Sequence, residues 1–90
     1  MQKPSLARFV LVPTDCLLGQ VQTNGADVAP AVITRVWSDT MVNVQIFLDA
    51  GPVVARTSVH LYDTAEDAAA GAPSAERAFA ELRCYWPPRV

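Results

Sequence analysis

The stretch that decides the fold is residues 31–62, AVITRVWSDTMVNVQIFLDAGPVVARTSVHLY. It contains runs rich in β-branched and aromatic residues at 31–37, 41–49 and 53–62, separated by short turn segments at 38–40 and 49–52. Within each run the side chains alternate with the period of two that places successive residues on opposite faces of a sheet. We therefore expect a three-stranded antiparallel meander over this stretch.

The middle run gives the clearest prediction of core residues. Its two faces differ in polarity, with Val42, Val44, Ile46 and Leu48 opposed to Asn43, Gln45, Phe47 and Asp49. Such alternation is typical of a strand with one buried face, so we expect residues 42–48 to form the centre of the core. The same rule puts Ile33, Arg35 and Trp37 on one face of the first run, and Val53, Ala55, Thr57, Val59 and Leu61 on one face of the third.

The flanking segments predict two further strands and a helical insertion. Residues 6–12 are apolar on nearly both faces and indicate a first strand that Pro13 stops. Residues 64–67, TAED, have the spacing of a helix capping box, and a second helix is expected from Ser74, with Arg83 on its outward face. Residues 84–86 predict a short closing strand, which ends at the proline pair 87–88.

Together these elements predict one mainly β domain over residues 1–90. It would consist of about five strands, with an N-terminal arm at 1–5, a long loop at 14–29, an Ala-rich insertion at 63–83 and a tail at 87–90. We expect an SH3-like barrel or a strongly curved antiparallel sheet, because closure lets the last strand cover an otherwise unpaired edge. An oligonucleotide-binding-type barrel is the alternative.

Composition and charge exclude several partners. The net charge of −2 argues against electrostatic capture of nucleic acid, which needs clustered cations. The apolar runs fall far short of the ~20 residues of a membrane span, and the first residues lack the apolar segment of a secretory signal. We expect synthesis in the cytoplasm and no membrane partner.

The residue types that carry chemistry do not form a recognisable site. Cys16 and His60 could in principle supply a nucleophile and a base, but no local signature surrounds Cys16. Asp39 and Asp49 stand in turns, where aspartates usually bond to local backbone. No close Cys or His pair indicates a metal site, and no glycine-rich loop indicates a phosphate site. We expect no enzyme activity, metal, cofactor or small-molecule substrate, and reduced thiols at Cys16 and Cys84 in or beside the core.

Candidate contact residues come from the aromatic residues, the long loop and the tail. We assign Phe47 and Trp86 to the core, whereas the sequence leaves open whether Trp37 is core or interface. A long loop in a small domain is typically functional, which points to its turn-forming tip. The candidate protein-interface residues are Trp37, Asn24, Gly25, Trp86, Arg89 and Val90.

Several short motifs resemble a group of small proteins encoded by tailed bacteriophages. The likeness covers residues 28–62 and 84–90, and it lies in VWSDT at 36–40, VNV at 42–44, FLD at 47–49, RTSV at 56–59 and YWPPRV at 85–90. Pro88 stands where the group usually has Glu, and the segment 63–83 is longer and more helical than in the group. Members are mostly uncharacterised, so the resemblance implies a phage setting and transfers no activity and no site residue.

Two functions from different classes fit this setting. The first is a virion structural protein, an accessory capsid protein that binds the major capsid or another virion protein in many copies, after assembly in the bacterial host cytoplasm. Homo-oligomers, particularly trimers, would be natural for it. The alternative is a non-virion phage protein that binds and modulates a host protein, with residues 64–81 as the recognition element.

Overall fold

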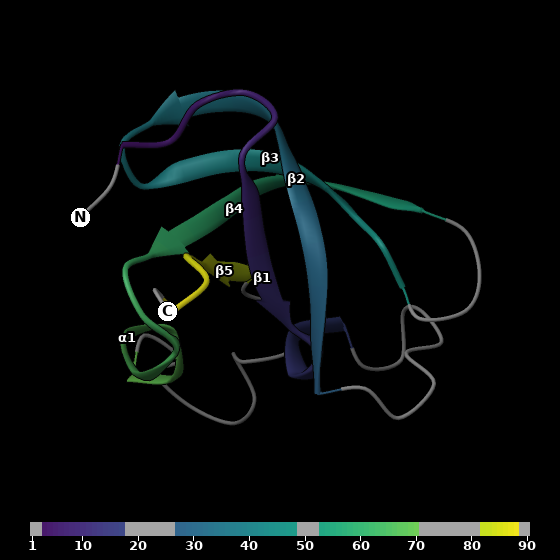
Figure 1. Cartoon of the computed structure of the whole chain (residues 1–90), viewed down its shortest axis with the longest axis vertical. Helices are drawn as coiled ribbons and strands as arrows, with labels where there is room; N and C mark the ends of the chain where they lie inside the picture. The colour runs from purple at the N-terminus through teal and green to yellow at the C-terminus, as the bar shows by residue number, and fades with distance from the viewer. Residues whose placement is uncertain (1–2, 18–26, 49–52, 71–81, 89–90) are drawn as a thin grey trace.

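The fold is a small closed barrel. The computed structural model describes residues 3–17, 27–48, 53–70 and 82–88. Its strands are β1 (Phe9–Pro13), β2 (Val28–Ser38), β3 (Met41–Ile46), β4 (Val54–Tyr62) and β5 (Arg83–Tyr85), joined by a 3-10 helix η1 (Thr14–Leu17) and an α-helix α1 (Ala65–Ala70) (Figure 1). The mainly β prediction, with a short helix before the last strand, is confirmed. Within these described ranges no helix is long and apolar enough to cross a membrane.

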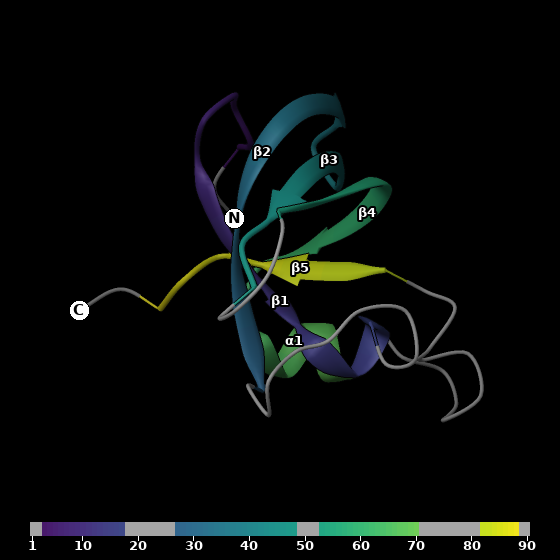
Figure 2. The same cartoon turned by 90° about the vertical axis from the view of Figure 1, so that its right-hand side faces the viewer.

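The strands follow one another around the barrel in chain order. Each of the pairs β1–β2, β2–β3 and β3–β4 is antiparallel, which confirms the predicted meander. The short β5 then closes the barrel, because it pairs in parallel with β4 and antiparallel with β1 (Figure 2). A parallel pair needs a long crossover, which the segment between Tyr62 and Arg83 supplies. This sequential order fits the SH3-like expectation better than the Greek-key order of an oligonucleotide-binding barrel.

The core lies inside the barrel and consists mainly of small branched side chains. The strands contribute Val10, Val12, Ala29, Ala31, Ile33, Val42, Val44, Ile46, Val59, Leu61 and Cys84, and Leu17 and Trp86 complete the cluster. Leu48 packs partly buried against them. The core prediction for residues 42–48 is therefore confirmed at its apolar positions, as are the predicted burial of Cys84 and of Trp86. The side chain of Cys16 lies outside the described residues.

Phe47 is not a core residue, contrary to its assignment from the sequence. The backbone N–H of Phe47 donates to the carbonyl oxygen of Pro30 at 2.8 Å, so β2 and the end of β3 stay paired at this point. Its neighbour Ile46 points into the barrel, and Phe47 therefore points outward, where it is 38% exposed. The prediction failed because an aromatic side chain on a strand was assumed to face the core.

Strict alternation is interrupted at three places in the meander. Register shifts fall between Ile33 and Arg35, between Val36 and Ser38, and opposite Val42 to Val44 on β4. Ser58, which lies at the third shift, has a positive φ of 56°. As a result, the residues of β2 that were expected to share a face differ in burial: Ile33 is buried, whereas Arg35 and Trp37 are exposed. The same holds for the third run, in which the later residues are buried (Val59 and Leu61) and the earlier ones are exposed (Val53, Ala55 and Thr57). The predicted common faces are wrong in these two strands because each shift moves later side chains to the other face.

The expected long loop at 14–29 is shorter than predicted at both ends. Residues 14–17 form η1, in which Leu17 is fully buried, and β2 begins at Val28. The backbone N–H of Thr14 donates to the carbonyl oxygen of Asp27 at 3.0 Å, which holds the two ends of the connection together. The tip, with Asn24 and Gly25, lies outside the described residues.

Arg83 fixes α1 onto the barrel. The helix begins as its capping sequence predicts, since the backbone N–H of Asp67 donates to Thr64 Oγ1 at 3.1 Å. Arg83 is only 1% exposed, and its Nη1 donates to the carbonyl oxygen of Ala68 at 2.9 Å. The sequence placed Arg83 on the outward face of a helix, but it is the first residue of β5 and lies beneath α1. The second helix expected from Ser74 lies outside the described residues.

Tyr85, the last residue of β5, is also buried. Burial raises the pKa of its hydroxyl, and the negative charge of Glu66 on α1 raises it further. The residue therefore favours its neutral form in the folded barrel.

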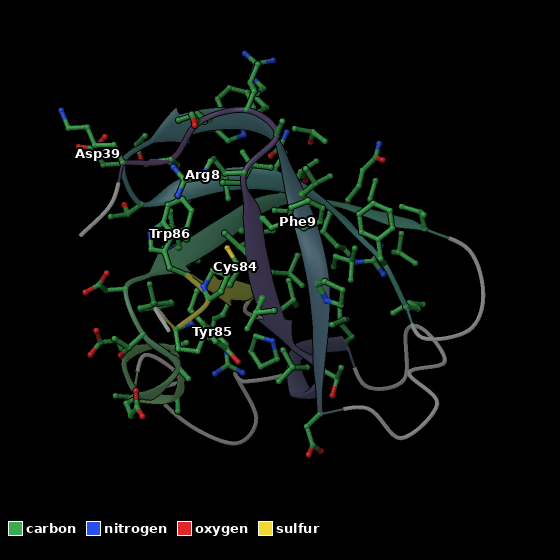
Figure 3. All side chains as sticks on the ribbon, viewed as in Figure 1. Arg8, Phe9, Asp39, Cys84, Tyr85 and Trp86 are labelled. Carbon is green, nitrogen blue, oxygen red and sulfur yellow. The ribbon has the colours of Figure 1, made fainter. Side chains whose placement is uncertain are left out.

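The chain before β1 packs onto the chain after β5. The guanidinium carbon of Arg8 lies 4.9 Å from the ring centroid of Trp86, and Figure 3 shows the two side chains next to each other. Ala7, with a positive φ of 70°, donates its N–H to the carbonyl oxygen of Ile33 at 2.9 Å. The first strand thus begins at Phe9 rather than at Leu6, because the backbone turns sharply at Ala7.

We predict that Val44→Asp unfolds the domain. Val44 is 1% exposed, and an unpaired carboxylate there would cost several kcal/mol against a total stability of ~5–15 kcal/mol. Thermal unfolding followed by circular dichroism measures the effect, with Gln45→Glu as the control at the exposed neighbouring position. A native-like transition in Val44→Asp would contradict the core assignment.

We predict that Arg83→Ala lowers the free energy of unfolding by about 2–5 kcal/mol, because it leaves a void under α1 and removes the bond to Ala68. Denaturant titration gives the value. Arg56→Ala, on the partly exposed side of β4, is the matched control and should cost about 1 kcal/mol or less. Equal losses in the two variants would show that Arg83 does not hold the helix.

Candidate functional site

The outer surface of the barrel carries a nearly continuous apolar face. On β1 and β2 the residues between the buried ones point outward, and the register sets them in rows: Phe9 beside Val32, Leu11 beside Pro30, and Pro13 beside Val28. The rows continue onto β3 and β4, where Gln45 stands beside Val32 and Ala55, and Phe47 bonds through its backbone to Pro30. Val53 precedes Val54, the partner of Ile46. We call this set the apolar face: Phe9, Leu11, Pro13, Val28, Pro30, Val32, Gln45, Phe47, Val53 and Ala55. It contains no charged residue, and Gln45 is its only polar side chain.

The apolar side chains of this face are accessible. Phe9 is 57% exposed, Val53 49%, Phe47 38% and Val28 37%. The rings of Phe9 and Phe47 approach to 6.4 Å between centroids with an interplanar angle of 36°, an arrangement common for paired aromatic rings. Figure 3 shows Phe9 beside β2 on the face turned toward the viewer. This exposed apolar surface is a candidate interaction site.

A second feature, which we call the Trp37 platform, lies where β2 ends. It consists of Arg35, Trp37, Asn43 and Ser58. Trp37 is 52% exposed, yet its Nε1 donates to Asn43 Oδ1 at 2.8 Å, and the guanidinium carbon of Arg35 lies 3.9 Å from the centroid of its ring. The indole is therefore held in one orientation on the surface.

Asn43 organises the platform from the outward face of β3. It stands opposite Arg35 in the register, and its Oδ1 also accepts the backbone N–H of Ser58 at 2.9 Å. Because of the register shift on β4, the Ser58 N–H is not part of the regular backbone pairing between β3 and β4, and the bond to Asn43 gives it an acceptor. One amide oxygen thus fixes both the exposed indole and the positive-φ residue. Trp and Arg are the residue types most often responsible for binding energy at protein interfaces.

The residues proposed from the sequence are not brought together at one site. Trp37 is a surface residue and not part of the core, and its role as a contact stays a prediction. Trp86 is 3% exposed beneath Arg8, and its Nε1 has no hydrogen-bond partner among the described residues. Asn24, Gly25, Arg89 and Val90 lie outside the described residues, so their role as contacts stays a prediction.

Sequence reasoning missed Phe9, Phe47 and Arg35 as surface candidates. A signal for Phe9 was present, because residues 6–12 are apolar on nearly both faces while a barrel strand has only one face to bury. Arg35 gave no such signal, since its position against the indole depends on the register shifts beside it.

The candidates for chemistry remain scattered. His60 is partly buried on β4, where it pairs with Met41 and Arg83, and nothing is described of the Cys16 side chain. In the part of the chain that the structure describes, no group of three or more His, Cys, Asp or Glu side chains is placed to hold a metal ion.

The fold and its surface define the class of protein as a small closed β-barrel with an exposed apolar face and an oriented surface tryptophan. Comparisons with protein-family models, with curated proteins and with solved structures find no match.

We predict that Asn43→Ala lowers the free energy of unfolding by about 1–3 kcal/mol, because it leaves the Ser58 N–H and the Trp37 indole N–H without their acceptor. Denaturant unfolding measures the loss, and the indole N–H resonance of Trp37 should exchange faster with water. Gln45→Ala, on the outward face of the same strand, is the control and should change stability by about 0.5 kcal/mol or less. Equal losses in the two variants would contradict the role given to Asn43.

Proposed function

We propose that this barrel is a protein-docking module that works as an accessory capsid protein of a tailed bacteriophage, binding the shell in many copies. The observation that carries the proposal is the apolar face. A surface with no charge and one polar side chain gains most from an apolar partner surface, because burial of apolar area supplies the free energy of association.

The closed barrel supports binding through this face rather than through strand addition. Each strand has two neighbouring strands, so among the described residues an incoming strand would find unpaired backbone mainly along β4 before His60, which β5 does not reach. The outward rows of β1 to β4 are then the natural contact surface. Their partner would be the major capsid protein or another virion protein.

The size of the face favours attachment in many copies over one strong pairwise complex. Four strands about 4.8 Å apart and five residues about 3.3 Å apart give roughly 15 by 15 Å in projection. A typical stable interface buries about 800 Å² on each partner, so the apolar face can serve only as the centre of such an interface. Weak single contacts suit a repeating shell, where copies at symmetry-related sites also contact one another. Trimers around a symmetry axis are one such arrangement.

The phage setting comes from the motif resemblance, and the location that follows is the virion, assembled in the host cytoplasm. The second candidate, a non-virion protein that binds a host protein, is favoured by one observation. Glu66 and Asp67 are exposed on α1, within the segment expected to form a recognition element for that function.

The test that separates these candidates is quantitative mass spectrometry of purified particles from the phage. Many copies of this chain per particle, in fixed ratio to the major shell protein, are expected for an accessory capsid protein. Absence from the particles would overturn the capsid proposal and favour the host-directed function.

We predict that Phe9→Gln weakens binding to shells lacking this protein by at least roughly thirtyfold, the loss typical of an aromatic hot-spot residue. Co-sedimentation with such shells measures the affinity. Leu6→Gln is the matched control, because Leu6 is also an exposed apolar residue, at 65%, but lies outside the apolar face. Both variants should keep the thermal transition of the original chain. Equal binding by the two variants would argue against the apolar face as the docking surface.

A further inference from the structure

The Trp37 platform has positive charge and no acidic member. Arg35, which lies on the indole, supplies this charge. The acidic residue nearest in sequence to Trp37 is the exposed Asp39 in the β2–β3 turn, which is not a member of the platform. This end of the molecule is suited to a partner that carries carboxylates.

The geometry of Arg35 suits a carboxylate in particular. With the guanidinium carbon 3.9 Å from the indole centroid, one face of the group is covered by the ring. Stacking of this kind leaves the N–H groups at the edge of the plane available for bidentate bonding to a carboxylate. Among the described residues, no carboxylate forms an ion pair with Arg35.

The same chain has an exposed acidic segment elsewhere. Asp63, Glu66 and Asp67 are all exposed in and just before α1, and the last turn of this helix has no basic residue. Glu66 and Asp67 also suit the first turn of a helix, where negative charge is favourable. That local role leaves their exposed carboxylates able to contact a partner.

The two charged segments lie toward opposite ends of the molecule. In Figures 1 and 2 the β2–β3 turn is at the top of the barrel and α1 is at the bottom, and Figure 3 labels Asp39 at that upper turn. They are therefore placed to meet between two copies rather than within one copy.

We propose that copies of this chain associate head to tail, with the acidic segment of α1 in one copy bound to the Trp37 platform of the next. The occupant is a second copy because both complementary surfaces belong to this chain. Such a contact is heterologous, so repetition gives a closed ring if the rotation between copies closes and a filament if it does not. The inference does not rest on the proposed capsid function and uses a different surface.

Analytical ultracentrifugation of the purified full chain tests the proposal. Association should be strong at about 0.01 M salt, where charges interact over ~30 Å, and at least about tenfold weaker at 1 M, where they interact over ~3 Å. Arg35→Glu alone and Glu66→Lys alone should each reduce association at least about tenfold, because each puts like charges together. The double variant Arg35→Glu, Glu66→Lys should recover much of it, as should an equal mixture of the two single variants.

Matched controls use charges outside both surfaces. Lys3→Glu and Asp27→Lys reverse an exposed charge of the same sign as Arg35 and Glu66, respectively, and at about 0.1 M salt, where charges interact over ~10 Å, should leave association within about twofold of the original chain. Circular dichroism verifies that α1 and the barrel persist in each variant. Should Glu66→Lys disturb the helix, Asp63→Lys repeats the test from outside it.

A chain that stays monomeric at low salt overturns the proposal, as does association that neither responds to salt nor recovers in the charge-exchange variants. Loss of shell binding by Phe9→Gln with salt-dependent association intact would separate the two surfaces. If an acidic peptide bound the platform while the chain stayed monomeric, the occupant would be another protein and the head-to-tail contact would be rejected.

Discussion

The limited interior of a closed five-stranded barrel is the constraint on which the rest of this structure depends. A small barrel leaves room inside only for side chains that fit between its walls, and here these are mainly Val, Ala and Ile. Each strand also has one inward face only, so further apolar residues on that strand must stand outside. The exposed positions of Phe9 and Phe47 follow from this limit. The apolar face thus results from the fold together with a sequence that has more apolar residues than the interior of the barrel can hold.

The predictions that succeeded depended on local sequence patterns, and those that failed depended on contacts between residues far apart in the sequence. Alternation identified the meander, and turn and proline signals placed the last strand and the short helix close to their observed positions. Alternation alone did not reveal the register shifts. A register shift depends on how two strands pair with each other, and no repeating pattern in the sequence indicates where it falls. Trp37 shows the difference, since its exposure depends on bonding to Asn43 and on the irregular pairing near it.

Arg83 shows a second limit of sequence reasoning. Its charge and its position in an Ala- and Glu-rich segment favoured an outward helical site, yet it occupies β5 and bonds to the carbonyl oxygen of Ala68. A buried arginine is unusual unless it is well bonded, and no feature of the neighbouring residues indicates that α1 would cover it. Of the candidate contacts, only Trp37 and Trp86 lie within the described residues, and one is exposed while the other is buried.

The pairing of β5 with β1 and β4 also has a consequence for how the chain reaches its folded state. Leu11 and Tyr85 meet across almost the full length of the chain, whereas the meander forms between neighbouring segments. Contacts between residues far apart in sequence form slowly, because the loop between them must close first. Until then β1 and β4 are the open edges of a four-stranded sheet, the kind of surface on which strands of other molecules can pair. Where many copies are synthesised together, β5 of one molecule could close the sheet of another, and exchange of this strand is the misfolding route that the topology leaves open.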